Sequence, residues 1–159
     1  MSSTAPANTS KAASKYLTVT LDNESYGIAV LKVREIIRLQ KITPIPQMPD
    51  FVKGVINLRG RIIPVIDLAS RFGIAGAARA KETRIVVAAA ASTRVGLVVD
   101  GVSEVLMVSD SAVEPTPAVA TGPDAAFVRG IARLDDRLVI LLALDALFGA
   151  AEIGELAVA

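Results

Sequence analysis

The chain has 159 residues, of which 52% are apolar, 17 are basic and 16 are acidic, giving a net charge of +1. No basic stripe with interleaved stacking rings is present, which argues against a nucleic-acid partner. Histidine and cysteine are both missing, so the usual ligands of Zn²⁺ and Cu, the commonest general base and any disulfide are excluded. Their absence fits a reducing compartment. Phosphate-cradling glycine loops are missing too, and the sequence therefore predicts no cofactor and no metal.

The N-terminal segment is rich in Ser, Ala and Thr and contains no apolar stretch. We therefore expect a disordered tail over residues 1–14 and no secretory signal. Residues 16–21 alternate and are rich in β-branched side chains, which predicts a strand. Residues 22–24 are typical of a turn, and residues 25–30 return as the second strand of a hairpin. The longest apolar runs are too short to cross a membrane, so we expect no direct membrane insertion.

Residues 31–39 are ambiguous, because their apolar side chains fit a helical face as well as a strand. The later segment 100–108 has the same spacing. Gly101 is a poor helix former, and β-branched residues are frequent in both segments, so we expect two strands. Each segment is followed by a connector with three prolines, residues 40–50 and 109–126. These connectors are expected to be loops, because proline removes a hydrogen-bond donor from a sheet.

Two hairpins come next, over residues 54–66 and 130–142, each with two residues between its apolar runs. Gly60 suits a turn that needs positive φ, and Pro64 inside a strand indicates an edge or a bulge. A short helical turn ended by glycine closes each hairpin, at residues 67–72 and 143–148.

The chain contains two copies of this pattern. Residues 51–73 align without a gap with residues 127–149, and residues 26–39 align with residues 95–108. The identical pairs include Val33/Val102, Glu35/Glu104, Gly54/Gly130, Leu58/Leu134 and Arg61/Arg137. About five short strands per copy favour closure into a small barrel, because closure removes exposed strand edges. We therefore expect an all-β domain over residues 15–149, made of adjacent or intertwined barrels at about 15–73 and 84–149. Residues 74–83 would be the junction, and residues 150–159 a C-terminal tail.

Several carboxylates lie within or beside apolar segments, and a small hydrolase could use a pair of them. Glu35 with Asp67 or Asp100 could act on a glycosidic bond if the two groups converged within about 5–10 Å in a cleft. The alternative is that Asp100 belongs to a turn, and that Glu35 and Glu104 form the solvated face of their strands. We favour the alternative, so we expect a binding module rather than an enzyme.

The segment GVINLRGRIIPVIDL, residues 54–68, resembles the signature of the CheW family of chemotaxis coupling proteins. Supporting matches lie in order over residues 16–149: the Tyr26-Gly-Ile and Val33-x-Glu35-Ile36 positions, the approach Ile45-Pro-x-x-Pro49-x-Phe51, VGLVVDGVSEVL over 95–106, Glu114-Pro-x-Pro117 and the closing segment 127–148.

The resemblance implies two five-stranded SH3-like barrels with short helical turns, sharing a hydrophobic centre. It also implies a non-catalytic cytoplasmic adaptor that joins a CheA-type histidine kinase to the cytoplasmic tips of methyl-accepting chemoreceptors. An adaptor of a non-flagellar array, for example one that controls pili, would use the same fold and is not discriminated by the sequence.

The resemblance also implies where the partners bind. The receptor tip, a helical hairpin, would dock between the barrels on Val33, Glu35, Arg59, Val95, Gly96, Val102 and Val105. Core packing of the valines and a solvated turn at Arg59 are the alternatives. A kinase contact would involve Glu114 and Val119, where some family members carry a basic residue and an aromatic one.

Overall fold

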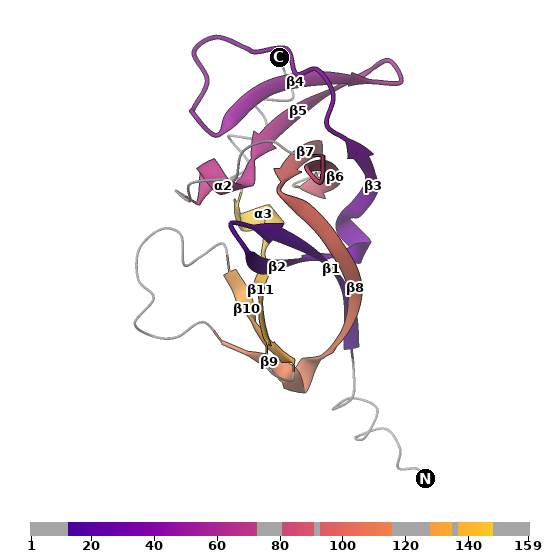
Figure 1. Ribbon diagram of the computed structural model, residues 1–159, viewed down its shortest axis with the longest axis vertical. Helices are drawn as coiled ribbons and strands as arrows, with labels where there is room; N and C mark the ends of the chain where they lie inside the picture. The colour runs from indigo at the N-terminus through magenta and orange to yellow at the C-terminus, as the bar shows by residue number, and fades with distance from the viewer. Residues whose placement is uncertain (1–12, 73–80, 91–92, 116–127, 135–136, 148–159) are drawn as a thin grey trace.

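A computed structural model describes residues 13–72, 81–90, 93–115, 128–134 and 137–147, and most of these residues lie in eleven strands that form two sheets. The six-stranded sheet has the order β8-β1-β2-β11-β10-β9, and the five-stranded sheet has the order β3-β6-β7-β5-β4. The two sheets occupy opposite ends of the long axis (Figure 1). The all-β class expected from the sequence is confirmed.

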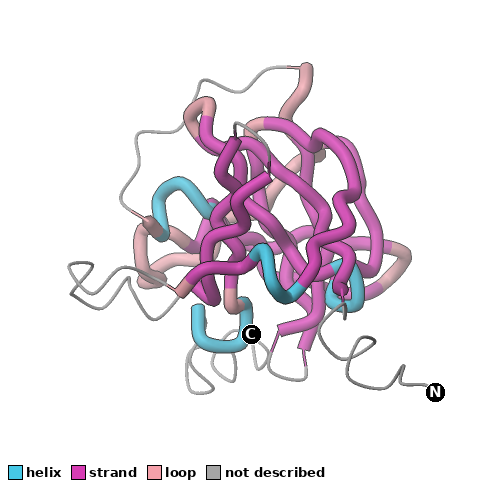
Figure 2. Tube along the Cα trace, turned by 90° about the horizontal axis from the view of Figure 1, so that it is seen from below, coloured by secondary structure: helices cyan, strands magenta, loops and turns pink. Residues whose placement is uncertain are grey.

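The six-stranded sheet consists of β1 (Ala13–Leu21), β2 (Glu24–Ala29), β8 (Gly101–Ser109), β9 (Val113–Glu114), β10 (Val128–Leu134) and β11 (Arg137–Leu142). The five-stranded sheet consists of β3 (Val33–Arg38), β4 (Val52–Leu58), β5 (Arg61–Asp67), β6 (Arg84–Ala90) and β7 (Thr93–Val99). The helical segments are short: η1 (Val30–Lys32), α2 (Leu68–Arg71), η2 (Asp110–Ala112) and α3 (Leu144–Leu147). Figure 2 shows them in cyan, between and beside the strands.

The two halves of the chain exchange their first hairpins. The β1–β2 hairpin pairs with β8 and β11 of the second half, and the β6–β7 hairpin pairs with β3 and β5 of the first half. The expected division at residues 73 and 84 therefore does not separate the sheets, since each sheet takes strands from both halves. Of the two arrangements that the sequence left open, the intertwined one matches this topology.

Equivalent strands of the two copies keep equivalent pairings. Val65 faces Gly96 in one parallel pair, and Leu141 faces Gly27 in the other. Both β4 and β10 shift register just before a glycine, Gly54 in one copy and Gly130 in the other. These glycines allow a second chain segment to approach: a Cβ on Gly54 would lie 2.0 Å from the carbonyl oxygen of Thr43. The sequence repeat is thus also a repeat of register.

The described residues form three hydrophobic clusters. One lies inside each barrel, and the largest lies between the barrels and takes residues from both sheets. Strand β6 shows how one strand serves two of them: Ile85 and Val87 face the interior of the first barrel, whereas Val86 and Ala88 face the shared cluster. Period-two alternation in a strand buried on both faces explains its continuous apolar sequence.

Most expected elements are found. Within residues 31–39 and 100–108 the expected strands are β3 and β8, although Leu31 and Lys32 belong to η1, and α2 and α3 confirm the two short helical turns. The tail expected over residues 1–14 ends too late, because β1 already begins at Ala13, which pairs with Ser109. The loop expected over residues 109–126 contains η2 and the two-residue strand β9. Residues 74–80, the C-terminal tail and most of the N-terminal tail lie outside the described residues.

Pro64 is accommodated at a point where β5 has a neighbour on one side only. Its partner across the β4–β5 pair is Val55, whose own N–H and C=O bond to Thr43 on the far side of β4. The nitrogen of Pro64 therefore points away from β4, towards β7. The β7 pairing begins only at Val65, so no ladder bond is lost, and the expected local edge is found.

Candidate functional site

An open groove of about 690 Å³ lies where the two sheets meet. Its walls come from Ile36 on β3, from the start of β6, from the β1–β2 turn and from the first residues of β8, including Val102. Asp100 fixes the position of the turn, because its carboxylate accepts a hydrogen bond of 2.8 Å from the Asp22 N–H. The main-chain N–H of Asp100 donates to the Thr20 carbonyl at 2.9 Å. The groove is thus built from both halves of the exchanged fold.

Val33 and Val102 occupy equivalent positions at the starts of β3 and β8. Both are half-buried, and both pack against the shared cluster. Val33 pairs with Ala88, and Val102 pairs with Val19, so each valine meets a hairpin contributed by the other half. Each valine therefore exposes part of its side chain to solvent and packs the rest against the core. The sequence offered either a receptor contact or a core position for these valines, and each side chain combines the two environments.

The other three apolar positions expected in the receptor site behave differently. Val105 is 53% exposed on the outer face of β8. Val95 is fully buried in the shared cluster, and Gly96 is buried where a Cβ would come within 2.9 Å of Ile85. Val95 has no exposed surface and Gly96 is buried, so in this structure neither offers a side chain for direct contact with a receptor. They hold β7 between β6 and β5 beneath the surface.

Glu35 and Arg59 form a bidentate ion pair on the surface. Arg59 donates from Nη1 to Oε1 at 2.8 Å and from Nη2 to Oε2 at 2.6 Å. Their contact joins the edge strand β3 to the β4–β5 turn. Hydrogen bonding to Arg59 lowers the pKa of the Glu35 carboxyl, with a smaller contribution from the charge of Arg94. A pair this exposed contributes little to folding, because water screens it.

The turn that carries Arg59 is held in a left-handed conformation. Arg59 has φ 53° and Gly60 has φ 82°, as a type I′ hairpin turn requires at both central positions. The Asn57 side chain accepts a hydrogen bond of 2.8 Å from the Gly60 N–H. Arginine is an unusual residue at positive φ, and its placement there aims the guanidinium across the barrel at Glu35.

The second barrel has its own carboxylate–arginine pair. Glu104, the equivalent of Glu35, accepts a hydrogen bond of 2.9 Å from Arg137 at the start of β11. Arg137 also reaches the hydroxyl of Ser25 at 3.4 Å. The main chain of Glu104 exchanges hydrogen bonds with the buried hydroxyl of Thr18, which satisfies that polar group.

Glu114, expected in the kinase contact, is exposed in β9 and pairs with Arg133 on the neighbouring strand β10. The distances are 2.6 Å from Nε to Oε2 and 3.2 Å from Nη2 to Oε1. Hydrogen bonding to Arg133 lowers the pKa of Glu114. Val119 lies outside the described residues.

The carboxylates considered for hydrolysis each have a local partner. Asp67 caps α2 by accepting from the Ala69 N–H at 3.1 Å, Asp100 holds the β1–β2 turn, and Glu35 is bound to Arg59. Within the described ranges no group of three His, Cys, Asp or Glu residues could hold a metal ion. In the same part of the chain, no helix is long and apolar enough to span a bilayer.

Ile36 lines the groove, but it was not among the receptor-contact residues expected from the sequence. It is 43% exposed and lines the groove opposite Val102. Its equivalent in the repeat is Val105, which was singled out, so comparing the two copies position by position would have found it.

A protein-family model described as "CheW-like domain" matches residues 15–152. The chemotaxis protein CheW of Klebsiella aerogenes is 39% identical over 138 residues, which cover 87% of this chain and 83% of that protein. The chemotaxis protein CheW of Rhizobium meliloti is 38% identical and covers 82% of this chain and 84% of its own. The crystal structure of the scaffolding protein TtCheW from Thermoanaerobacter tengcongensis matches with a TM-score of 0.81 and 41% identity, over 89% of this chain and 96% of that one.

Proposed function

The chain belongs to the CheW-like family of chemotaxis scaffold proteins, and from this premise we propose that it couples methyl-accepting chemoreceptors to a CheA-type histidine kinase. The family resemblance stated from the sequence is confirmed, and the fold is that of two SH3-like barrels. As a member of this family the chain is a non-catalytic scaffold. The proposed partners would place it in the cytoplasm, at the inner ends of the receptors.

The observation that carries the proposal is the groove between the barrels. Strand β3 forms one wall of this groove through Ile36, and the same strand carries Glu35, which is paired with Arg59. A helical hairpin presents apolar side chains at helical spacing, and a groove with apolar anchors and a charged rim suits it. Ile36 and Val102 line the groove and would supply its anchors. Val33 and Val105, on the same two strands, would add apolar contacts, and the ion pair would supply the rim. Val95 and Gly96 would act indirectly, by holding the strand beneath.

The kinase surface is proposed around β9. Glu114 reaches solvent at the end of the six-stranded sheet that is far from β4 and β5 (Figure 1). Because Arg133 already neutralises it, a partner there would meet an ion pair rather than a free carboxylate. Val119 remains part of this proposal as the apolar neighbour in the following segment.

The proposal is tested by capture experiments with the full chain against a receptor cytoplasmic fragment and against the kinase, each alone. We expect the chain to bind both separately and to bridge them when both are present. Arg59→Asn should weaken capture of the receptor fragment and leave capture of the kinase unchanged, whereas Arg133→Gln should do the reverse. Failure of the unaltered chain to capture either partner would overturn the proposal.

A further inference from the structure

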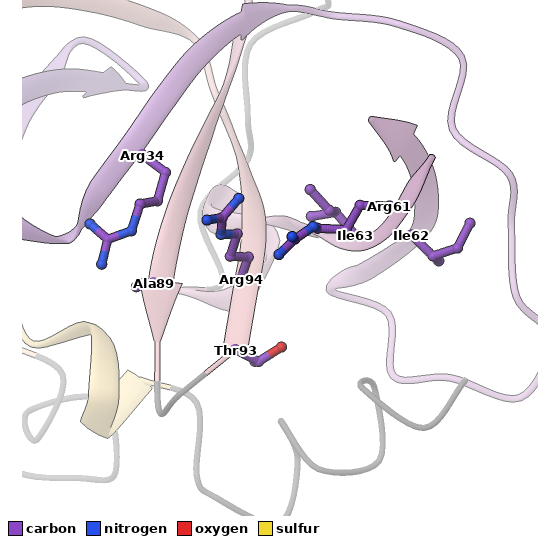
Figure 3. A pocket seen from close by; sticks show the side chains of 7 residues that line it. All are labelled: Arg34, Arg61, Ile62, Ile63, Ala89, Thr93 and Arg94. Atoms are coloured by element: carbon purple, nitrogen blue, oxygen red, sulfur yellow. The ribbon is translucent and has the colours of Figure 1, made fainter. Parts of the chain in front are cut away.

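Three arginines surround an open pocket of about 450 Å³ on the five-stranded sheet. Arg34 comes from β3, Arg61 from the first position of β5 and Arg94 from β7, and all three are exposed. The buried side chain of Ile63 lines the pocket, and Ile62 stands at its rim with 56% of its surface exposed. Figure 3 shows the guanidinium groups of Arg61 and Arg94 approaching each other from different strands.

The positive charge of this pocket is not neutralised within the described part of the chain. The described ion pairs include no carboxylate bound to any of the three arginines. Arg34 donates a hydrogen bond of 2.8 Å to the Leu31 carbonyl, which leaves its charge in place. Glu35 is near enough for Arg94 to lower its pKa, but both of its oxygens are bound by Arg59. Neighbouring like charges repel each other, so the cluster does not stabilise the free protein.

The second barrel shows that the fold does not require these arginines. In the repeat alignment, Arg34 corresponds to Ser103, Arg94 to Ser25 and Arg61 to Arg137. The single arginine of that set is bound to Glu104 and reaches Ser25. The same three positions therefore form a neutralised polar cluster in one barrel and an open cationic pocket in the other. Because the fold is kept with serines at two of these positions in the second barrel, the arginines of the first barrel are better explained by binding of a ligand than by folding.

We propose that the Arg34–Arg61–Arg94 pocket binds carboxylate side chains of a protein partner, on a segment that also places an apolar side chain against Ile62. Guanidinium groups bind carboxylates in a bidentate, planar geometry. The pocket lining includes no lysine and no glycine-rich loop, and a small inorganic anion would leave the exposed side chain of Ile62 uncovered. The pocket shares no residue with the proposed receptor and kinase contacts, so the inference goes beyond the proposed function.

The test uses the full chain and three probes. The first probe is a synthetic helical peptide with Glu at positions i and i+4 between leucines, the second is the same peptide with Gln in place of Glu, and the third is inorganic phosphate. Binding is followed by NMR of the arginine Nε–H groups. The variant Arg34→Ser with Arg94→Ser installs the residues of the other barrel, and Arg38→Ser removes an exposed arginine of the same strand β3 that lies outside the pocket.

We expect the Glu peptide to shift the Arg61 resonance in the parent and in the Arg38→Ser variant. The double variant and the Gln peptide should each weaken binding at least about tenfold, as the loss of charge-assisted hydrogen bonds implies. The double variant should melt no lower than the parent, since repulsion is relieved. Equal binding of the Glu and Gln peptides, or a double variant that binds the Glu peptide as well as the parent, would overturn the inference. Phosphate that shifts Arg61 when the Glu peptide does not would overturn it too, in favour of a small-anion site.

The same samples separate this inference from the proposed function. A parent chain that binds the Glu peptide but captures neither the receptor fragment nor the kinase would support the pocket and reject the coupling role. A parent chain that captures both partners without any response of Arg61 to the Glu peptide would reject the pocket and support the coupling role.

Discussion

Replacing three valines at two depths separates the core from the proposed receptor groove. Val95 is fully buried, whereas its neighbours in the proposal, Val33 and Val102, are half-buried against the same cluster. Val→Ala at a fully buried site removes two methyl groups, worth about 1.6 kcal/mol of transfer free energy, and leaves a cavity that adds up to about 1 kcal/mol. We expect Val95→Ala to lower the free energy of unfolding by about 1.6–2.6 kcal/mol.

The half-buried valines should lose about half as much. Val33→Ala and Val102→Ala are each expected to cost about 1 kcal/mol of unfolding free energy. Their additional effect should be weaker binding of the receptor fragment, and the two effects on binding should differ, because one asymmetric helical hairpin cannot contact both barrels alike. Val95→Ala should leave the affinity of the folded protein nearly unchanged.

Urea denaturation followed by fluorescence of an attached probe gives the unfolding free energies, and calorimetric titration with the receptor fragment gives the affinities. The reasoning fails if Val33→Ala and Val102→Ala cost as much stability as Val95→Ala and bind the receptor as the parent does. In that case all three valines are core residues, and the groove has no apolar anchor at these positions.

Arg59→Asn should lower the melting temperature by no more than Glu35→Gln does, because Asn tolerates left-handed φ and the lost ion pair is exposed, and it should weaken receptor capture; a larger loss of melting temperature by calorimetry would make Arg59 a structural residue. Gly54→Ala should cost at least about 3 kcal/mol of unfolding free energy, since a Cβ would lie 2.0 Å from the Thr43 carbonyl. Gly60→Ala, where nothing lies within 4 Å, should cost only about 1 kcal/mol, and equal losses in urea denaturation would contradict the difference. The pKa of Glu35 is lowered in the folded protein. The stability that its ion pair with Arg59 contributes should therefore be present above the pKa of Glu35 in the unfolded chain, and it should vanish as the pH falls through the lower pKa of the folded protein. The parent and Glu35→Gln should therefore converge in melting temperature at acidic pH, and a gap that persists there would exclude the ion pair as its cause.

The repeat in the sequence was sufficient to predict two barrels, but not which hairpin closes which barrel. The β1–β2 and β6–β7 hairpins are both apolar on both faces: Tyr16 faces one cluster and Leu17 another, as do Ile85 and Val86. Either hairpin would bury its side chains in either sheet. The choice is made by long-range packing in the shared cluster, which no local pattern records.

The site was predicted less completely for a related reason. The family motif identified Glu35 and Arg59, which the structure brings together from positions 24 residues apart. Burial could have been inferred for Val95, since it alternates with Leu97 and Val99 on one face of a two-sided strand. The arginine pocket is formed by residues of three strands, so no local pattern predicts it. Its one signal in the sequence is the comparison of the two copies, in which Arg34 replaces Ser103 and Arg94 replaces Ser25.

The exchange of hairpins explains how a protein without a catalytic group can act as a coupling element. Strand β3 is held by β6, and β8 is held by β1, so each wall of the groove depends on a hairpin from the opposite half. The Val33 and Val102 side chains rest on those hairpins, and the shared cluster fills the space between the sheets. Neither barrel can therefore rotate against the other without opening the cluster that both have in common. A partner bound at one sheet meets a surface whose position relative to the other sheet is fixed, which is the property that a scaffold between two signalling proteins requires.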